Sequence, residues 1–103
     1  MSAGVVYEVN LDLDAAIAED YRAWLGPHTR EILALPGFLD ARIHTQLDPP
    51  AESGRVRLSV RYRLDRLESL DAYLRDHAQR LRADAVARFG DRFSATRRVL
   101  RED

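Results

Sequence analysis

Ten consecutive residues, RVRLSVRYRL, alternate between polar and apolar side chains without interruption. A period of two is the side-chain alternation of a β-strand, whose successive residues point to opposite faces. The polar positions hold arginine except at Ser59, so one face of this strand belongs to a core and the other carries positive charge. The apolar positions are Val56, Leu58, Val60, Tyr62 and Leu64.

Periodic segments on both sides of this strand predict the rest of the fold. Alternation recurs in Val5–Leu11, Phe38–Leu47 and Phe93–Leu100, and apolar residues three or four apart make helical stripes in Ile17–Leu35 and Leu70–Phe89. The order is βαββαβ. Right-handed crossovers then place both helices on one face of a four-stranded antiparallel sheet of order 4132. We therefore expect an α+β, ferredoxin-like plait that occupies residues 1–103 as a single domain.

Local signals predict how the helices begin, bend and end. Gly26 and Pro27 interrupt the first helical stripe, and proline removes a backbone hydrogen bond, so we expect a kink or a break into two short helices. Asp65–Glu68 has the spacing of a capping box and predicts the start of the second helix. Gly90 is placed to end that helix.

Strand alternation assigns residues to the two faces of the sheet. In the second strand the helix-facing residues are expected to be Leu39, Ala41, Ile43 and Leu47. The face that no helix covers is expected to be polar, with the residues Val6, Glu8, Asn10, Arg42, His44, Gln46, Arg57, Ser59, Arg61, Ser94, Thr96 and Arg98.

Composition narrows the range of functions. The chain has no cysteine, which excludes disulfides and thiolate chemistry, and all 16 of its basic residues are arginine. A net charge of -1 argues against a nucleic-acid-binding domain. The first ten residues lack the basic and apolar segments of a signal peptide, and no apolar run is long enough to span a bilayer. We therefore expect a cytoplasmic protein without a membrane contact.

Two histidines are the main candidates for chemistry. His28 and His77 lie on the sheet-facing stripes of the two predicted helices, so they are expected to approach each other above the central strands. Two interpretations remain open: hydrogen-bonded imidazoles that fill a core, or polar groups in an apolar small-molecule pocket. The candidate ligand-binding residues around them are Tyr7, Tyr21, Trp24, Tyr62 and Tyr73.

Other kinds of site are disfavoured by the pattern. His44 alternates onto the opposite sheet face, so the three histidines should not converge on a metal ion, and we predict no metal and no cofactor. Domains of the same element order that bind RNA stack bases on sheet aromatics, but the central strands have none on their polar face. No serine lies in the strained turn that a Ser-His-Asp nucleophile needs.

Several short strings of residues resemble a known family over nearly the whole chain. The chain is similar to short bacterial proteins of the domain-of-unknown-function family 4286, identified as members of the dimeric α/β-barrel superfamily. The strings that carry the resemblance are Trp24-Leu25 with His28; Leu35, Gly37-Phe38 and Ala41-Arg42; His77-Ala78 with Leu81-Arg82; and Phe89-Gly90, Phe93, Ala95, Arg97-Arg98 and Leu100.

The resemblance implies a homodimer formed through the open sheet face. Members of the superfamily pair two sheets face to face, and Glu8 would then offset arginines of that face across the two-fold axis. The superfamily includes cofactor-independent monooxygenases, lactone isomerases and haem-degrading enzymes. Comparison with the haem-degrading members points to His77, Trp24 and Asn10.

Two classes of function follow. The first is a homodimeric domain that binds a small organic molecule or a protein partner without catalysis. The alternative is a cofactor-independent enzyme of the monooxygenase or isomerase type, with His28 or His77 as general base. Haem binding is a third and weaker hypothesis.

Overall fold

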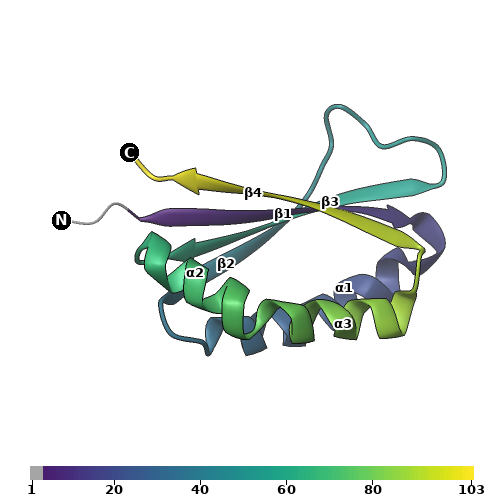
Figure 1. The fold of residues 1–103 in the computed structure, drawn as a ribbon. Helices are drawn as coiled ribbons and strands as arrows, with labels where there is room; N and C mark the ends of the chain where they lie inside the picture. The colour runs from purple at the N-terminus through teal and green to yellow at the C-terminus, as the bar shows by residue number, and fades with distance from the viewer. Residues whose placement is uncertain (1–3) are drawn as a thin grey trace.

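The computed structural model describes residues 4–103 and confirms the predicted order of strands along the chain and in the sheet (Figure 1). The sheet is antiparallel with the order β2-β3-β1-β4, which is the expected 4132 order read from the other edge. The strands are β1 Val5–Asp14, β2 Phe38–Thr45, β3 Arg55–Leu64 and β4 Phe93–Arg101.

The helices all lie against one face of this sheet, and the opposite face is uncovered (Figure 1). Three helices are present where two were predicted, preceded by the short 3-10 turn η1. Their bounds are η1 Ala15–Ile17, α1 Ala18–Leu33, α2 Leu67–Asp76 and α3 Ala78–Phe89. In the described part of the chain, no helix is both long enough and apolar enough to cross a membrane.

The core forms where the helices meet the apolar strand faces. Leu13 and Leu64 from the sheet, and Leu70 and Leu81 from the helices, are each 0% exposed. The register explains the sorting, because residues directly opposite on paired strands share a face: Tyr7 pairs with Tyr62 on the helix side. The predicted division of the sheet into an apolar and a polar face is confirmed for β1 and β3.

The predicted faces of β2 are wrong at both ends of the strand. Phe38 pairs with Leu64 but Asp40 pairs with Arg63, so one extra residue bulges from β2. Leu39 is that residue and is 54% exposed, while Phe38 takes the core position at 8% exposure. A bulge shifts the alternation by one residue, which periodicity alone does not reveal. Leu47 lies beyond the strand end and is 82% exposed.

The prediction at Gly26 and Pro27 was a kink or a break, and the break into two short helices is wrong, because α1 continues through both residues. Pro27 is exposed on the outer side of α1, where water can reach the carbonyl that its missing N–H leaves free. The turn is reinforced by the hydroxyl of Thr29, which donates a hydrogen bond of 2.8 Å to the carbonyl of Gly26.

The second predicted helix is divided at His77. Leu70 and Tyr73 of α2 are buried, and so are Ala78 and Leu81 of α3. Ala78 is five positions after Tyr73, a rotation of about 140° beyond one full turn in a regular helix, so one straight helix would place these two residues at opposite edges of its buried face. His77 resets the phase with φ −131° and ψ −31°.

The predicted capping box at the start of α2 does not form. The N-cap is Arg66, which makes no side-chain cap bond, and the Asp65 carboxylate instead accepts a 2.6 Å hydrogen bond from the Ser69 hydroxyl. The Asp65 amide donates to the carbonyl of Gly37, 2.9 Å away, and so ties the loop to the start of β2. Gly37 has φ +87°, and a side chain there would clash with Ser69.

Candidate functional site

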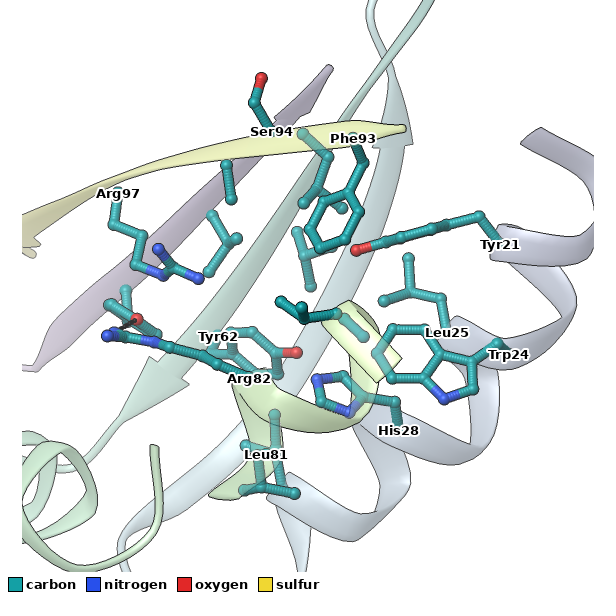
Figure 2. A pocket seen from close by; sticks show the side chains of 18 of the residues that line it. Tyr21, Trp24, Leu25, His28, Tyr62, Leu81, Arg82, Phe93, Ser94 and Arg97 are labelled. Atoms are coloured by element: carbon teal, nitrogen blue, oxygen red, sulfur yellow. Dashed lines mark hydrogen bonds between the residues drawn. The ribbon is translucent and has the colours of Figure 1, made fainter. Parts of the chain in front are cut away.

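A cavity of about 350 Å³ lies between the sheet and the helices (Figure 2). Its floor comes from β1, β3 and β4, and its walls come mainly from α1 and α3. The helix stripes place side chains over the sheet, and Leu81 and Ala85 are the buried residues of α3 that line the cavity. All five residues predicted to bind a ligand line this cavity: Tyr7, Tyr21, Trp24, Tyr62 and Tyr73.

The aromatic side chains form a connected group. The rings of Tyr7 and Tyr62 have centroids 6.1 Å apart, and the ring of Tyr73 lies edge-on to Tyr7, also at 6.1 Å. Burial raises the pKa of Tyr73 to about 12 and that of Tyr21 to about 12, and it raises the pKa of Tyr62 further. These phenols therefore stay neutral and able to donate a hydrogen bond.

Some of these hydroxyls have no partner in the protein. Within residues 4–103, no side-chain hydrogen bond engages Tyr21, Tyr62 or Tyr73. Figure 2 shows the hydroxyls of Tyr21 and Tyr62 directed into the cavity. These oxygens are open to the cavity and not enclosed by protein, since within residues 4–103 only Ser59 has a fully buried side-chain polar atom without a partner, so they can bond to water or to a ligand.

His28 lies on the α1 wall of the cavity, opposite the strands. Its imidazole stacks on the indole of Trp24 with ring centroids 4.3 Å apart and an interplanar angle of 25°. Burial lowers the pKa of His28, and the carboxylates of Glu31 and Asp84 oppose this shift in part. A neutral imidazole at neutral pH has one nitrogen free to accept a proton.

A surface hollow adjoins the cavity behind His28. His28 and Trp24 line both spaces, and the hollow of about 650 Å³ also contains Glu31 and Asp84. The imidazole therefore lies between the aromatic cavity and the solvent-open hollow, which carries the acidic side chains. A base in this position has a route for exchanging its proton with water.

His77 is not part of this arrangement. It lies at the junction of α2 and α3, half-buried, and its Nδ1 is 3.5 Å from Nη2 of Arg80. The residues that line the cavity include His28 but not His77. The two histidines therefore do not line one cavity, contrary to the expectation from the helix stripes.

Two arginines that the sequence analysis had not named as site residues also line the cavity. Arg82 comes from α3, and Arg97 comes from the helix-facing side of β4, where it is paired with Val9. Nη2 of Arg82 donates to the hydroxyl of Tyr7 at 2.9 Å. Alternation in β4 places Arg97 on the same face as Phe93 and Ala95, and that was the signal available in the sequence.

The open sheet face has a polar cluster around Glu8. The Glu8 carboxylate is 4% exposed and accepts hydrogen bonds from Arg98 Nε at 2.8 Å and from Asn10 Nδ2 at 2.9 Å, with Arg61 Nε at 3.2 Å. The bond from Arg98 is the main reason why the pKa of Glu8 is lowered. Glu8 is therefore paired within its own chain, whereas the sequence had suggested pairing across a two-fold axis.

The residues of the haem hypothesis do not meet. Asn10 lies on the open face, bonded to Glu8, while Trp24 lines the cavity on the other side of the sheet and His77 lies at the helix junction. Residues 4–103 also contain no group of three or more His, Asp or Glu side chains arranged to hold a metal ion.

Comparison with solved structures shows the fold. A conserved protein from Methanosarcina mazei Go1 is similar, with a TM-score of 0.72 and 15% identity over 98% of this chain and 94% of that one. A dimeric ferredoxin-like protein from an uncultured marine organism has a TM-score of 0.68 and 13% identity, with 98% and 96% covered.

A third similar structure is SnoaB, a cofactor-independent oxygenase from Streptomyces nogalater, with a TM-score of 0.63 and 10% identity over 99% and 95% of the two chains. No curated protein sequence matches this chain. Residues 4–103 match the sequence model of the domain of unknown function DUF4286, and the chain therefore belongs to that family.

Proposed function

We propose that this chain is a cytoplasmic, homodimeric domain that binds a small organic molecule in the cavity between sheet and helices, without catalysis. The observation that carries the proposal is the cavity of about 350 Å³, lined by aromatic rings and by polar groups directed inward. Its volume is within the range of small-molecule sites, and apolar walls with a few oriented polar groups are their usual composition.

The neutral dye N-phenyl-1-naphthylamine tests this proposal, because its emission rises in an apolar site. Trp24 is the only tryptophan of the chain and lines the cavity, so its fluorescence reports binding independently. We expect saturable dye binding that quenches Trp24. Ala95→Phe should reduce binding by filling part of the cavity from β4. Val99→Phe is the control on the same strand, since Val99 does not line the cavity. Absence of dye binding, or binding unaffected by Ala95→Phe, would overturn the proposal.

The homodimer is proposed to form through the open sheet face. That face is uncovered by any helix of the chain, and a structurally similar protein is described as a dimeric ferredoxin-like protein. The ion pairs around Glu8 make such an interface polar, so the association is expected to respond to salt.

Sedimentation velocity at micromolar concentration should give a dimer. Thr96→Glu adds a negative charge to the open face and should favour the monomer, whereas Gln79→Glu on the exposed side of α3 should not. A monomer for the unaltered chain at both low and moderate salt would refute the dimer.

A second candidate function is cofactor-independent catalysis with His28 as general base. The observation that favours it is a neutral imidazole between the cavity and a solvent-open hollow. The base would take a proton from a C–H or O–H of a bound substrate and release it through the hollow. The structural similarity to a cofactor-independent oxygenase is consistent with this reaction class.

Deuterium exchange at the acidic C–H of 2-tetralone in D₂O tests the base directly. Catalysed exchange that is lost in His28→Gln and kept in His77→Gln would support this function. Exchange no faster than in buffer would exclude it for this class of carbon acid and leave the binding function unaffected.

A further inference from the structure

We propose, on the basis of the small-molecule pocket proposed above, that its ligand is an organic anion whose negative group is bound between Arg82 and Arg97. Figure 2 shows both arginines on one side of the cavity, with His28 and Trp24 on the other. The cavity thus has a cationic end and an aromatic end. A molecule with an acidic group on an apolar or aromatic body matches both ends at once.

Arg97 lies where a strand normally contributes an apolar side chain to the core. In the register of β1 and β4, Leu11 pairs with Ala95 and Val9 pairs with Arg97, and all four residues face the helices. The first three are apolar and partly or fully buried. Arg97 at the fourth position is exposed, so its carbon chain can lie along the apolar wall while its guanidinium stays at the open side of the cavity.

Arg82 is held in position by a hydrogen bond. Its Nη2 donates to the phenolic oxygen of Tyr7 over 2.9 Å, which leaves the remaining N–H groups of the guanidinium available. Because the Tyr7 oxygen accepts this bond, its own proton is free to be donated to a ligand. A fixed guanidinium loses less freedom when it binds a carboxylate or sulfonate in a bidentate manner.

The positive charge of this end has no acidic partner in the described residues. The residues that line the cavity include no aspartate or glutamate. Neither Arg82 nor Arg97 has a carboxylate oxygen within 4.0 Å in residues 4–103, whereas Arg61 and Arg98 on the opposite sheet face share Glu8. Both arginines are exposed at the open side of the cavity, so an anionic ligand would replace water as their partner there.

The remaining walls indicate that the anion carries an apolar body. Val9, Leu11, Val60 and Ala95 form the floor beside the arginines. A small inorganic anion would leave these surfaces without a contact and would gain nothing from their burial. The neutral phenols offer donors and so also favour an electron-rich ligand over a cation.

The test compares two dyes that differ only in a sulfonate: N-phenyl-1-naphthylamine and 8-anilino-1-naphthalenesulfonate. Both are titrated into the full chain and its variants, with dye emission and Trp24 quenching as the two readouts. The unaltered chain should bind the sulfonate about 10-fold more tightly than the neutral dye, as expected for charge-assisted hydrogen bonds. Ala95→Phe should reduce the binding of both dyes, which assigns them to the cavity.

Arginine variants separate the charge from the pocket. Arg97→Gln and Arg82→Gln should each weaken the sulfonate about 10-fold and leave the neutral dye unchanged. Arg97→Lys should retain part of the preference, since a lysine keeps the charge without the planar fork. Arg42→Gln is the matched control, because Arg42 is exposed on the open face and should affect neither dye.

Each outcome decides between the two proposals. Binding of both dyes with equal affinity would overturn the organic anion and leave the small-molecule pocket intact. A sulfonate preference that persists in both Arg82→Gln and Arg97→Gln would also overturn it, because the charge would then be recognised elsewhere. If neither dye binds, the pocket and the anion both fail.

Discussion

The guanidinium of Arg82 and the phenol of Tyr7 join α3 to β1 by a hydrogen bond of 2.9 Å across the cavity. Tyr62 lies beside Tyr7 in the sheet, but its hydroxyl has no protein partner within residues 4–103. The two phenols therefore differ in what they contribute to stability. The Tyr7 oxygen accepts a hydrogen bond from Arg82, whereas the Tyr62 hydroxyl can bond only to water or to a ligand in the cavity.

We predict that Tyr7→Phe lowers the free energy of unfolding by about 1 kcal/mol, since it removes that bond. Tyr62→Phe should leave stability unchanged or raise it slightly, because it removes a hydroxyl without a partner. Urea unfolding followed by circular dichroism measures both. Equal losses for the two variants would contradict the prediction.

The carboxyl of Glu8 should control part of the acid stability. Its pKa is lowered, first by the bond from Arg98, so its folded value lies below its unfolded value. Its contribution is then complete above the unfolded value of about 4.3 and is lost as pH falls through the folded value.

Glu8→Gln should therefore lower the free energy of unfolding by about 1 kcal/mol at pH 7. This value is small because solvent screens the ion pairs, since both arginine partners are more than half exposed. Below pH 4 the variant should lose less stability than the unaltered chain. Glu52→Gln is the control, since Glu52 is exposed in the loop between β2 and β3 and makes no ion pair within residues 4–103. Thermal unfolding between pH 2 and pH 7 measures the difference. A steeper acid dependence in Glu8→Gln would be the wrong sign.

His28 should give a separate dependence at mildly acidic pH. Its pKa in the folded protein is below the ordinary histidine value of about 6.5, so the unfolded chain binds more protons in the window just below that value. Stability should therefore fall as pH drops through this window. His28→Gln should remove that slope, and His44→Gln, on the exposed open face, should not. An NMR titration gives the pKa of His28 directly, and a value above 6.5 would reject the assignment.

Pro27 should be replaceable with a gain in stability. Pro27→Ala restores the backbone N–H that can bond to the carbonyl of Ala23 inside α1, and alanine is the best helix former. We expect the free energy of unfolding to rise by about 1 kcal/mol and not by the full ~3 kcal/mol of the helix preference, because the greater freedom of the unfolded chain without proline opposes the gain. Amide exchange of His28–Leu33 should slow in parallel. Unchanged or lower stability would mean that the proline is needed at this position.

The bulge in β2 predicts opposite effects at neighbouring residues. Phe38→Ala should cost about 3 kcal/mol, because Phe38 is buried and packs edge-on against Tyr73 with ring centroids 5.2 Å apart. Leu39→Ala should cost less than 1 kcal/mol at 54% exposure. Chemical denaturation of both variants tests the register, and the strict alternation expected from sequence gives the reverse order.

Much of the fold was predictable because regular periods repeat over whole elements. The ten residues of β3 specified both sheet faces, and the order of periods along the chain specified the strand order. Errors arose where a single residue resets the phase. Leu39 does so in a strand and His77 does so between helices, and neither position carries a glycine or proline to announce it.

The candidate site was predicted in its aromatic part and missed in its charged part. Tyr7 and Tyr62 were identified because alternation places them on the apolar face, where an aromatic ring is expected. Arg97 occupies the same kind of position but was not assigned, since an arginine is normally interpreted as a solvent-facing residue. Arg82 could be assigned to the site only from the structure, because the assignment depends on how close α3 lies to β1.

The walls of the cavity differ in how firmly the rest of the fold holds them, partly because the second helical segment is divided at His77. β1 and β3 are each flanked by hydrogen-bonded strands on both sides, whereas β4 has a neighbour on one side only, and α3 is set off from α2 by the phase change. Substitutions in α3 and β4 therefore reshape the chamber without disturbing the central ladder. If the proposed pocket binds a small molecule, substitutions in α3 and β4 would change its ligand preference while the paired strands β1 and β3 keep their register.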